Sequence, residues 1–148
     1  MCRSSEPKQK GETMTSQERA AVMKKCQELS LAGRIAFPET VRRLSEAGVE
    51  RYHVDLTRDE TTYYLSCGES HALALGGPHG TINGPFDATG VEGAVRASQR
   101  GEVTYREFLS RIMAAGCVGY FTQITGRKVQ YVGRTGDMHV EPFPGTTV

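Results

Sequence analysis

The chain has 148 residues, enough for one domain, and its 38% hydrophobic and 24% charged residues are ordinary for a globular protein. Its 18 Lys and Arg nearly balance its 17 Asp and Glu, which argues against the broad basic surface of a nucleic-acid-binding protein. No apolar run reaches the roughly 18 residues of a membrane span, and the N-terminal segment lacks the apolar stretch of a signal peptide. We therefore expect a cytoplasmic protein whose partners are neither nucleic acid nor membrane.

The N-terminal part predicts a tail and then a helix. Residues 1–13 are polar and show no periodicity, which is typical of disorder. Thr15 and Glu18 have the spacing of a capping box, in which each side chain accepts a hydrogen bond from the other residue's backbone amide. The apolar residues that follow recur at helical spacing and are Val22, Cys26 and Leu29. We expect a single domain over residues 14–148 that opens with this helix.

The next segment predicts a second helix and two strands. Pro38 suits a first helical turn, where a backbone N–H is not needed, and Gly48 suits the left-handed residue that ends a helix. Apolar and polar side chains alternate over residues 52–57, which is the period of a half-buried strand, and residues 61–65 are rich in strand-forming residues. The predicted order is helix, helix, strand, strand.

The second half of the chain repeats the first at an offset of 68 residues. Residues 33–71 align with 101–139 without a gap, and ten of the 39 positions are identical, whereas chance would give roughly two or three. We therefore predict two repeats, about residues 15–75 and 83–144, joined by the Gly- and Pro-rich connector 76–85.

An internally duplicated (α)αββ unit predicts an α+β fold. A two-stranded hairpin is marginal in water, whereas two repeats can combine antiparallel hairpins into a four-stranded sheet covered by helices. A pseudo-two-fold axis would relate the repeats. The sequence leaves open whether the sheet is continuous or split.

Stretches of both repeats are similar to a known family. They are Phe37-Pro-Glu39, Ala47-Gly48-Val49, Val54-Asp55, Thr62-Tyr63-Tyr64, Thr104-Tyr105, Ala114-Ala115-Gly116, Gly136-Asp137 and His139-Val140-Glu141. In these, the chain resembles the YbcV-like proteins, a domain of unknown function that is sometimes labelled phage envelope protein. The resemblance extends over about residues 15–144. It implies a bacterial or prophage setting and brings no established activity or catalytic set.

Six residues at matching positions in the two repeats are candidates for ligand binding: Tyr52, Tyr63, Tyr120, Tyr131, Arg43 and Arg111. Aromatic cross-strand pairs stabilise antiparallel sheets, so a core role is the simpler interpretation of the tyrosines. The alternative is a pocket between the repeats in which the phenols meet a ligand. Each arginine follows a glutamate by four residues, which favours a surface ion pair; the alternative is that both arginines hold one anion.

Two histidines also recur, His71 and His139, each three residues after a glycine. Glu141 lies on the face of His139 if the chain is extended there, because side chains alternate along a strand. Two histidines and a carboxylate have the composition of an open metal site. A divalent metal bound by these three residues is therefore one hypothesis, and histidines with ordinary hydrogen bonds are the simpler interpretation.

Three functions remain open from the sequence. We favour a binding module whose cleft between the repeats accepts a small ligand or a partner peptide. The alternatives are an enzyme with a His-centred, metal-dependent site and a structural protein of prophage origin that assembles through an exposed sheet edge. A homodimer stays open, and the sequence identifies no catalytic residue.

Overall fold

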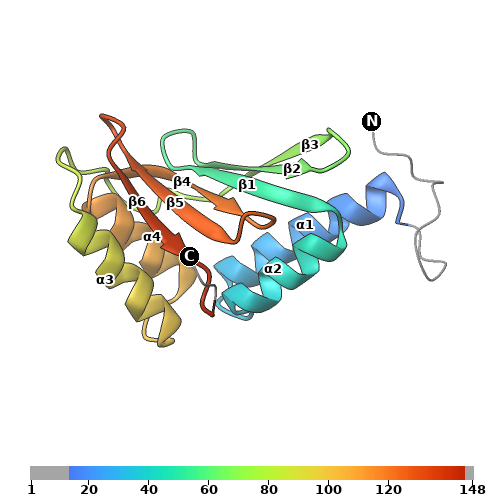
Figure 1. The fold of residues 1–148 in the computed structure, drawn as a ribbon, viewed down its shortest axis with the longest axis horizontal. Coiled ribbons are helices and arrows are strands. Elements are labelled where there is room, and N and C mark those ends of the chain that lie inside the picture. The colour runs from blue at the N-terminus through green and yellow to red at the C-terminus, as the bar shows by residue number, and fades with distance from the viewer. Residues whose placement is uncertain (1–13, 146–148) are drawn as a thin grey trace.

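The computed structural model describes residues 14–145, so the predicted tail lies outside the described residues. Within this range the chain forms a six-stranded antiparallel sheet with helices packed against one of its faces (Figure 1). The elements are α1 (Ser16–Leu31), α2 (Phe37–Glu46), β1 (Val49–Asp55), β2 (Glu60–Leu65), β3 (Ser70–Ala74), α3 (Ala88–Gln99), α4 (Tyr105–Ala114), β4 (Cys117–Gln123), β5 (Lys128–Gly133) and β6 (Met138–Pro142). The α+β fold class is confirmed.

Three helices in the described part of the chain begin at a side-chain cap, and the cap at Thr15 is the predicted one. The Thr15 and Thr104 hydroxyls each accept the backbone N–H of a glutamate three residues later, and both capping boxes are complete. Asp87 caps α3 in the same way through its carboxylate. Ala36 precedes α2 without a side-chain cap, and a proline in the first turn compensates by needing no N–H partner there.

The sheet is symmetric about its centre. Its strand order is β3-β2-β1-β4-β5-β6, and β1 and β4 pair antiparallel in the middle. Their register contains the pairs Tyr52–Thr122 and Val54–Tyr120, which the 68-residue offset interchanges, and His53–Phe121, which it maps onto itself. The rings of His53 and Phe121 stack at 4.2 Å between centroids. A pseudo-two-fold axis placed at this pair relates the two halves of the central pairing.

The prediction of two strands per repeat was incomplete. A third strand, β3 or β6, follows each hairpin and pairs with β2 or β5, so the continuous sheet has six strands and not four. Each third strand is only five residues long and contains few strand-forming residues. Its conformation therefore depends on a neighbouring strand. The repeat boundaries at about 15–75 and 83–144 stay a prediction, although α2/α4, β1/β4, β2/β5 and β3/β6 are each 68 residues apart.

The core lies between the sheet and two helix pairs. Helices α1 and α2 run side by side, and α3 and α4 form a second pair on the same face of the sheet (Figure 1). Leu44 and Ile112, at equivalent positions of α2 and α4, are fully buried. The predicted stripe of α1 is shifted by one residue, because Met23 is buried beside Cys26 while Val22 is only half-buried. The inner faces of β1, β2, β4 and β5 lie beneath both pairs.

Candidate ligand-binding cavity

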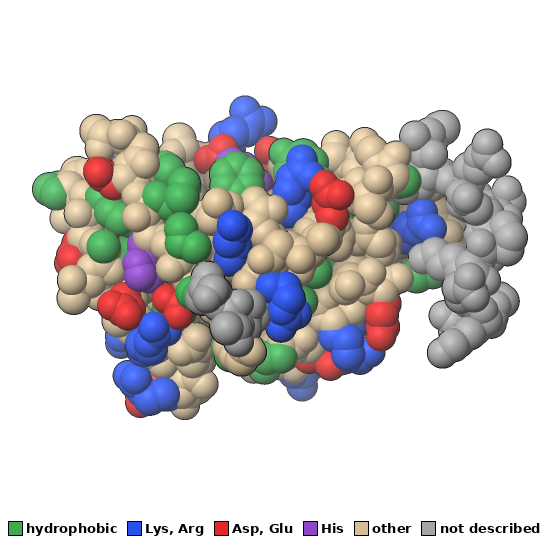
Figure 2. All heavy atoms as spheres, viewed as in Figure 1, with side chains coloured by type: hydrophobic (Ala, Val, Ile, Leu, Met, Phe, Trp, Pro, Cys, Tyr) green, Lys and Arg blue, Asp and Glu red, His purple; other side chains and the backbone are tan. Residues whose placement is uncertain are grey.

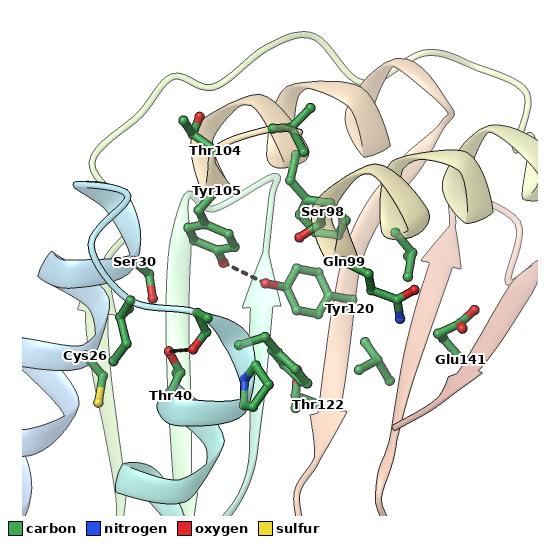
Figure 3. A pocket seen from close by; sticks show the side chains of 18 of the residues that line it. Cys26, Ser30, Thr40, Ser98, Gln99, Thr104, Tyr105, Tyr120, Thr122 and Glu141 are labelled. Atoms are coloured by element: carbon green, nitrogen blue, oxygen red, sulfur yellow. Dashed lines mark hydrogen bonds between the residues drawn. The ribbon is translucent and has the colours of Figure 1, made fainter. Parts of the chain in front are cut away.

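A cavity of about 890 Å³ lies between the two helix pairs and the inner face of the sheet (Figure 3). Residues of all four helices and of five strands line it. Small-molecule sites commonly have volumes of roughly 300–1,000 Å³ and mostly apolar walls with a few polar groups. The size of this cavity is therefore that of a site for a small organic molecule.

Four predicted tyrosines lie together on the floor of the cavity. Tyr52 and Tyr63 are cross-strand partners on β1 and β2, with ring centroids 5.5 Å apart. Tyr120 and Tyr131 form the equivalent pair on β4 and β5 at 5.3 Å. All four side chains line the cavity and are buried. They are therefore core residues that also present their surface to the cavity, so the two interpretations of the tyrosines are compatible.

Burial keeps these phenols protonated. It raises the pKa of Tyr52 to about 12, and it raises the pKa of Tyr63, Tyr120 and Tyr131 well above the ordinary 10.0. A neutral phenol offers one hydrogen to donate and an oxygen to accept. At neutral pH these side chains can thus supply hydrogen bonds and aromatic surface, but they are poor bases and poor nucleophiles.

A fifth tyrosine, which the sequence analysis did not single out, completes a polar contact in the cavity. Tyr105 begins α4, and its hydroxyl lies 2.6 Å from that of Tyr120 (Figure 3). The residue 68 positions earlier is Phe37, whose ring packs edge-on against Phe143 at 5.3 Å between centroids. In the alignment of the two repeats, this phenylalanine stands opposite the tyrosine. The informative signal is the hydroxyl that one repeat has and the other lacks.

Two threonines on the cavity wall were also missed. Thr61 and Thr122 are 1% and 0% exposed. Within the described residues, neither hydroxyl has a partner at the distance and angles of a hydrogen bond. The Thr122 hydroxyl faces the Tyr52 phenol. Both threonines occupy buried, inward positions of their strands, β2 and β4. A polar residue at such a position is the signal that would have found them.

Few charged groups reach the cavity. Its ionisable lining consists of Arg34, Glu102, Glu107 and Glu141, apart from phenols and one thiol. The Glu141 carboxylate is already paired, with Arg96 Nη1 at 2.6 Å and His139 Nε2 at 3.1 Å. On the face of the molecule seen in Figure 2, basic and acidic side chains are interspersed. The cavity therefore has no cluster of cations that would attract an anion.

The structure does not place Arg43 and Arg111 in the cavity lining. Arg43 Nε donates to Glu39 Oε2 at 2.9 Å, the predicted surface pair. Hydrogen bonds from Arg42 and Arg43 hold the pKa of Glu39 at about 2. Arg111 is exposed on α4, where Glu107 serves the capping box. The two arginines therefore do not take part in the cavity, and an anion held by both stays a prediction.

The three proposed metal ligands do not meet. His71 lies on β3 and His139 on β6, at opposite edges of the sheet and five strand spacings of about 4.8 Å apart. His139 does contact Glu141, whereas the nearest carboxylate to His71 is that of Glu69, at 3.6 Å. Among residues 14–145, no three or more His, Cys, Asp and Glu side chains are arranged to hold a metal ion. The hypothesis was wrong because the third strand of each repeat places its histidine far from the pseudo-two-fold axis.

No helix in the described part of the chain is both long enough and apolar enough to cross a lipid bilayer.

The comparisons with known proteins give a family-model match over part of the chain and no function. A family model described as "Protein of unknown function (DUF1398)" matches residues 2–73. No curated protein matches the chain. The match supports the expectation of an uncharacterised family for the first half of the chain. The YbcV-like name, the bacterial or prophage setting and the cytoplasmic location stay predictions.

Proposed function

We propose that this protein is a binding module that holds a small, neutral and largely apolar ligand in the cavity between its two halves. The observation that carries the proposal is the cavity of about 890 Å³ with five tyrosines among its lining residues. Aromatic side chains provide large contact surfaces at low cost in conformational entropy.

The chemistry of the lining favours binding over catalysis and a neutral ligand over an anion. The phenols stay protonated near neutral pH because burial raises their pKa. One arginine and three glutamates line the cavity, so a negatively charged ligand would lose its hydration and meet three carboxylates for a single cation. An enzyme remains the alternative function, and a partner peptide the alternative ligand.

Phenylnaphthylamine, a neutral dye whose fluorescence rises in apolar surroundings, tests the proposal. We expect saturable binding to the wild-type protein and a higher melting temperature in its presence, because a ligand of the native state stabilises that state. Anilinonaphthalenesulfonate has the same rings and a sulfonate, and we expect it to bind roughly tenfold more weakly.

A pair of tryptophan variants tests the location of the binding site. Ser98 lines the cavity from α3 and is exposed, so Ser98→Trp can obstruct the cavity without disturbing the core. Thr89→Trp is the matched control, because Thr89 is exposed on the same helix nine residues earlier, on its opposite side. We expect Ser98→Trp to weaken dye binding at least about tenfold and Thr89→Trp to leave it unchanged. Absence of saturable binding to wild type, or equal binding by both variants, would contradict the proposal.

A further inference from the structure

The Tyr105–Tyr120 contact has one more hydrogen than it uses. Each phenol carries a single O–H, and a hydrogen bond between two phenols uses only one of the two. With the oxygens 2.6 Å apart, one phenol donates to the other and the second hydrogen must point elsewhere. A phenol that accepts a hydrogen bond is also the better donor, since linked hydrogen bonds polarise one another.

The surroundings of this pair are aromatic. Phe108 packs against both rings, with centroids 6.4 Å from Tyr105 and 6.3 Å from Tyr120. Tyr131 contacts Tyr120 from the other side at 5.3 Å. Both phenols line the cavity, and Figure 3 shows their hydroxyls meeting within it. An acceptor inside the cavity can therefore receive the remaining hydrogen.

The Tyr105–Tyr120 pair makes the two halves of the cavity chemically different, although the sheet beneath them is symmetric. The equivalent position in the first repeat is Phe37, which has no hydroxyl, so Tyr52 has no phenol partner there and faces the Thr122 hydroxyl instead. One half of the cavity thus carries a donor pair and the other half presents an aromatic ring at the same place.

We propose that the Tyr105–Tyr120 pair recognises a neutral hydrogen-bond acceptor, such as a carbonyl oxygen, on an aromatic ligand and so fixes the orientation of that ligand. This inference rests on the proposed function of the cavity. The ligand class it specifies is an uncharged aromatic molecule that carries a ketone, ester or amide oxygen at one end.

Two probes of nearly equal shape isolate the acceptor. Acetonaphthone carries a carbonyl oxygen, whereas ethylnaphthalene has the same ring system and lacks the oxygen. Each is titrated as a competitor of phenylnaphthylamine against wild type, Tyr105→Phe, Tyr120→Phe and the double variant. Tyr64→Phe is the matched control, because Tyr64 lies on β2 with its side chain on the helix-free face, next to Arg51.

We expect the double variant to bind acetonaphthone roughly three- to tenfold more weakly than wild type, which is the usual effect of one hydrogen bond. Its affinity for ethylnaphthalene should change less than about twofold, since both substitutions preserve shape. Each single variant should lose less than the double variant, because the remaining phenol still carries an O–H. Tyr64→Phe should behave as wild type.

The possible outcomes separate this inference from the proposed function. If the double variant binds both naphthalenes as wild type does, the donor role of the phenol pair is wrong and the binding cavity stands. Equal losses for the two probes would show that the phenols act only through packing, which also overturns the inference. If wild type binds neither the dye nor the naphthalenes, the proposed function fails and this inference fails with it.

Discussion

The hydroxyl of Thr61, on the inner face of the sheet, lowers the stability of the folded protein. Thr61 is 1% exposed and its Oγ1 has no hydrogen-bond partner within the described residues. The residue 68 positions later is Val129, which has nearly the same shape, is also buried and has no polar group to satisfy. A buried hydroxyl without a partner destabilises a protein by about 1–3 kcal/mol.

We therefore predict that Thr61→Val raises the free energy of unfolding by about 1 kcal/mol. Urea denaturation followed by circular dichroism measures the change. Thr62→Val is the control, because Thr62 is the next residue of β2, is half-buried and faces the helix-free side; its effect should stay within about 0.5 kcal/mol. A Thr61→Val protein less stable than wild type would show that the hydroxyl is satisfied in solution.

At the scale of the elements, equivalent helix ends differ in what surrounds them. Gly48 and Gly116 follow α2 and α4 with φ of +89° and +87°, the left-handed region that glycine adopts without strain. A Cβ at Gly48 would meet nothing within 4 Å, whereas one at Gly116 would lie 2.1 Å from the Pro85 carbonyl oxygen. The connector is packed there, since Asn83 and Asp87 donate backbone hydrogen bonds to carbonyls at the end of α4. It is therefore more than a spacer.

Alanine at the two glycines should consequently have unequal effects. Gly48→Ala should destabilise the protein by about 1–2 kcal/mol through backbone strain alone. Gly116→Ala should cost about 1–3 kcal/mol more, because the connector must also move away from α4. Unfolding free energies of the two variants in urea provide the comparison, with Gly48→Ala as the matched control for strain. Equal destabilisation would show that the connector is not held against α4.

At the scale of the whole molecule, the tyrosines couple stability to alkaline pH. Burial raises the pKa of Tyr52 to about 12 and those of Tyr63, Tyr120 and Tyr131 well above 10.0. The unfolded chain releases these protons near pH 10, so above that pH it binds fewer protons than the native state. Stability therefore falls as the pH rises from about 10 through the native-state values.

We predict that the protein keeps its stability from neutral pH to about pH 8, loses a little as the unfolded chain's thiols ionise, because burial also raises the pKa of Cys26 and Cys117, and unfolds cooperatively above about pH 10 to 12. Phenolate absorbance and far-ultraviolet circular dichroism, recorded across the same pH series, should change together, because ionisation requires opening of the core. Model peptides with one exposed tyrosine serve as the reference titration. Complete phenolate formation near pH 10 in a protein that keeps its circular dichroism would contradict buried, neutral phenols.

The local features of this protein follow from its sequence. Thr15 caps α1 as predicted, and Asp87 and Thr104 cap α3 and α4, because a cap depends on a side chain and amides only two or three residues away. The alternation of apolar and polar side chains around Tyr52 identifies the inner face of β1, because successive side chains of a strand point to opposite faces. The offset of 68 residues predicts the matched order of α2, β1 and β2 with α4, β4 and β5.

Tertiary structure alone decides which of these residues meet. The antiparallel pairing of β1 with β4 gathers Tyr52, Tyr63, Tyr120 and Tyr131 at the centre of the sheet, and the third strands carry His71 and His139 to its two edges. No spacing in the sequence specifies that pairing, because it joins segments about 68 residues apart whose register is set by the inward side chains of both strands. The cavity exists for the same reason, since its walls belong to two helix pairs that pack on the same sheet.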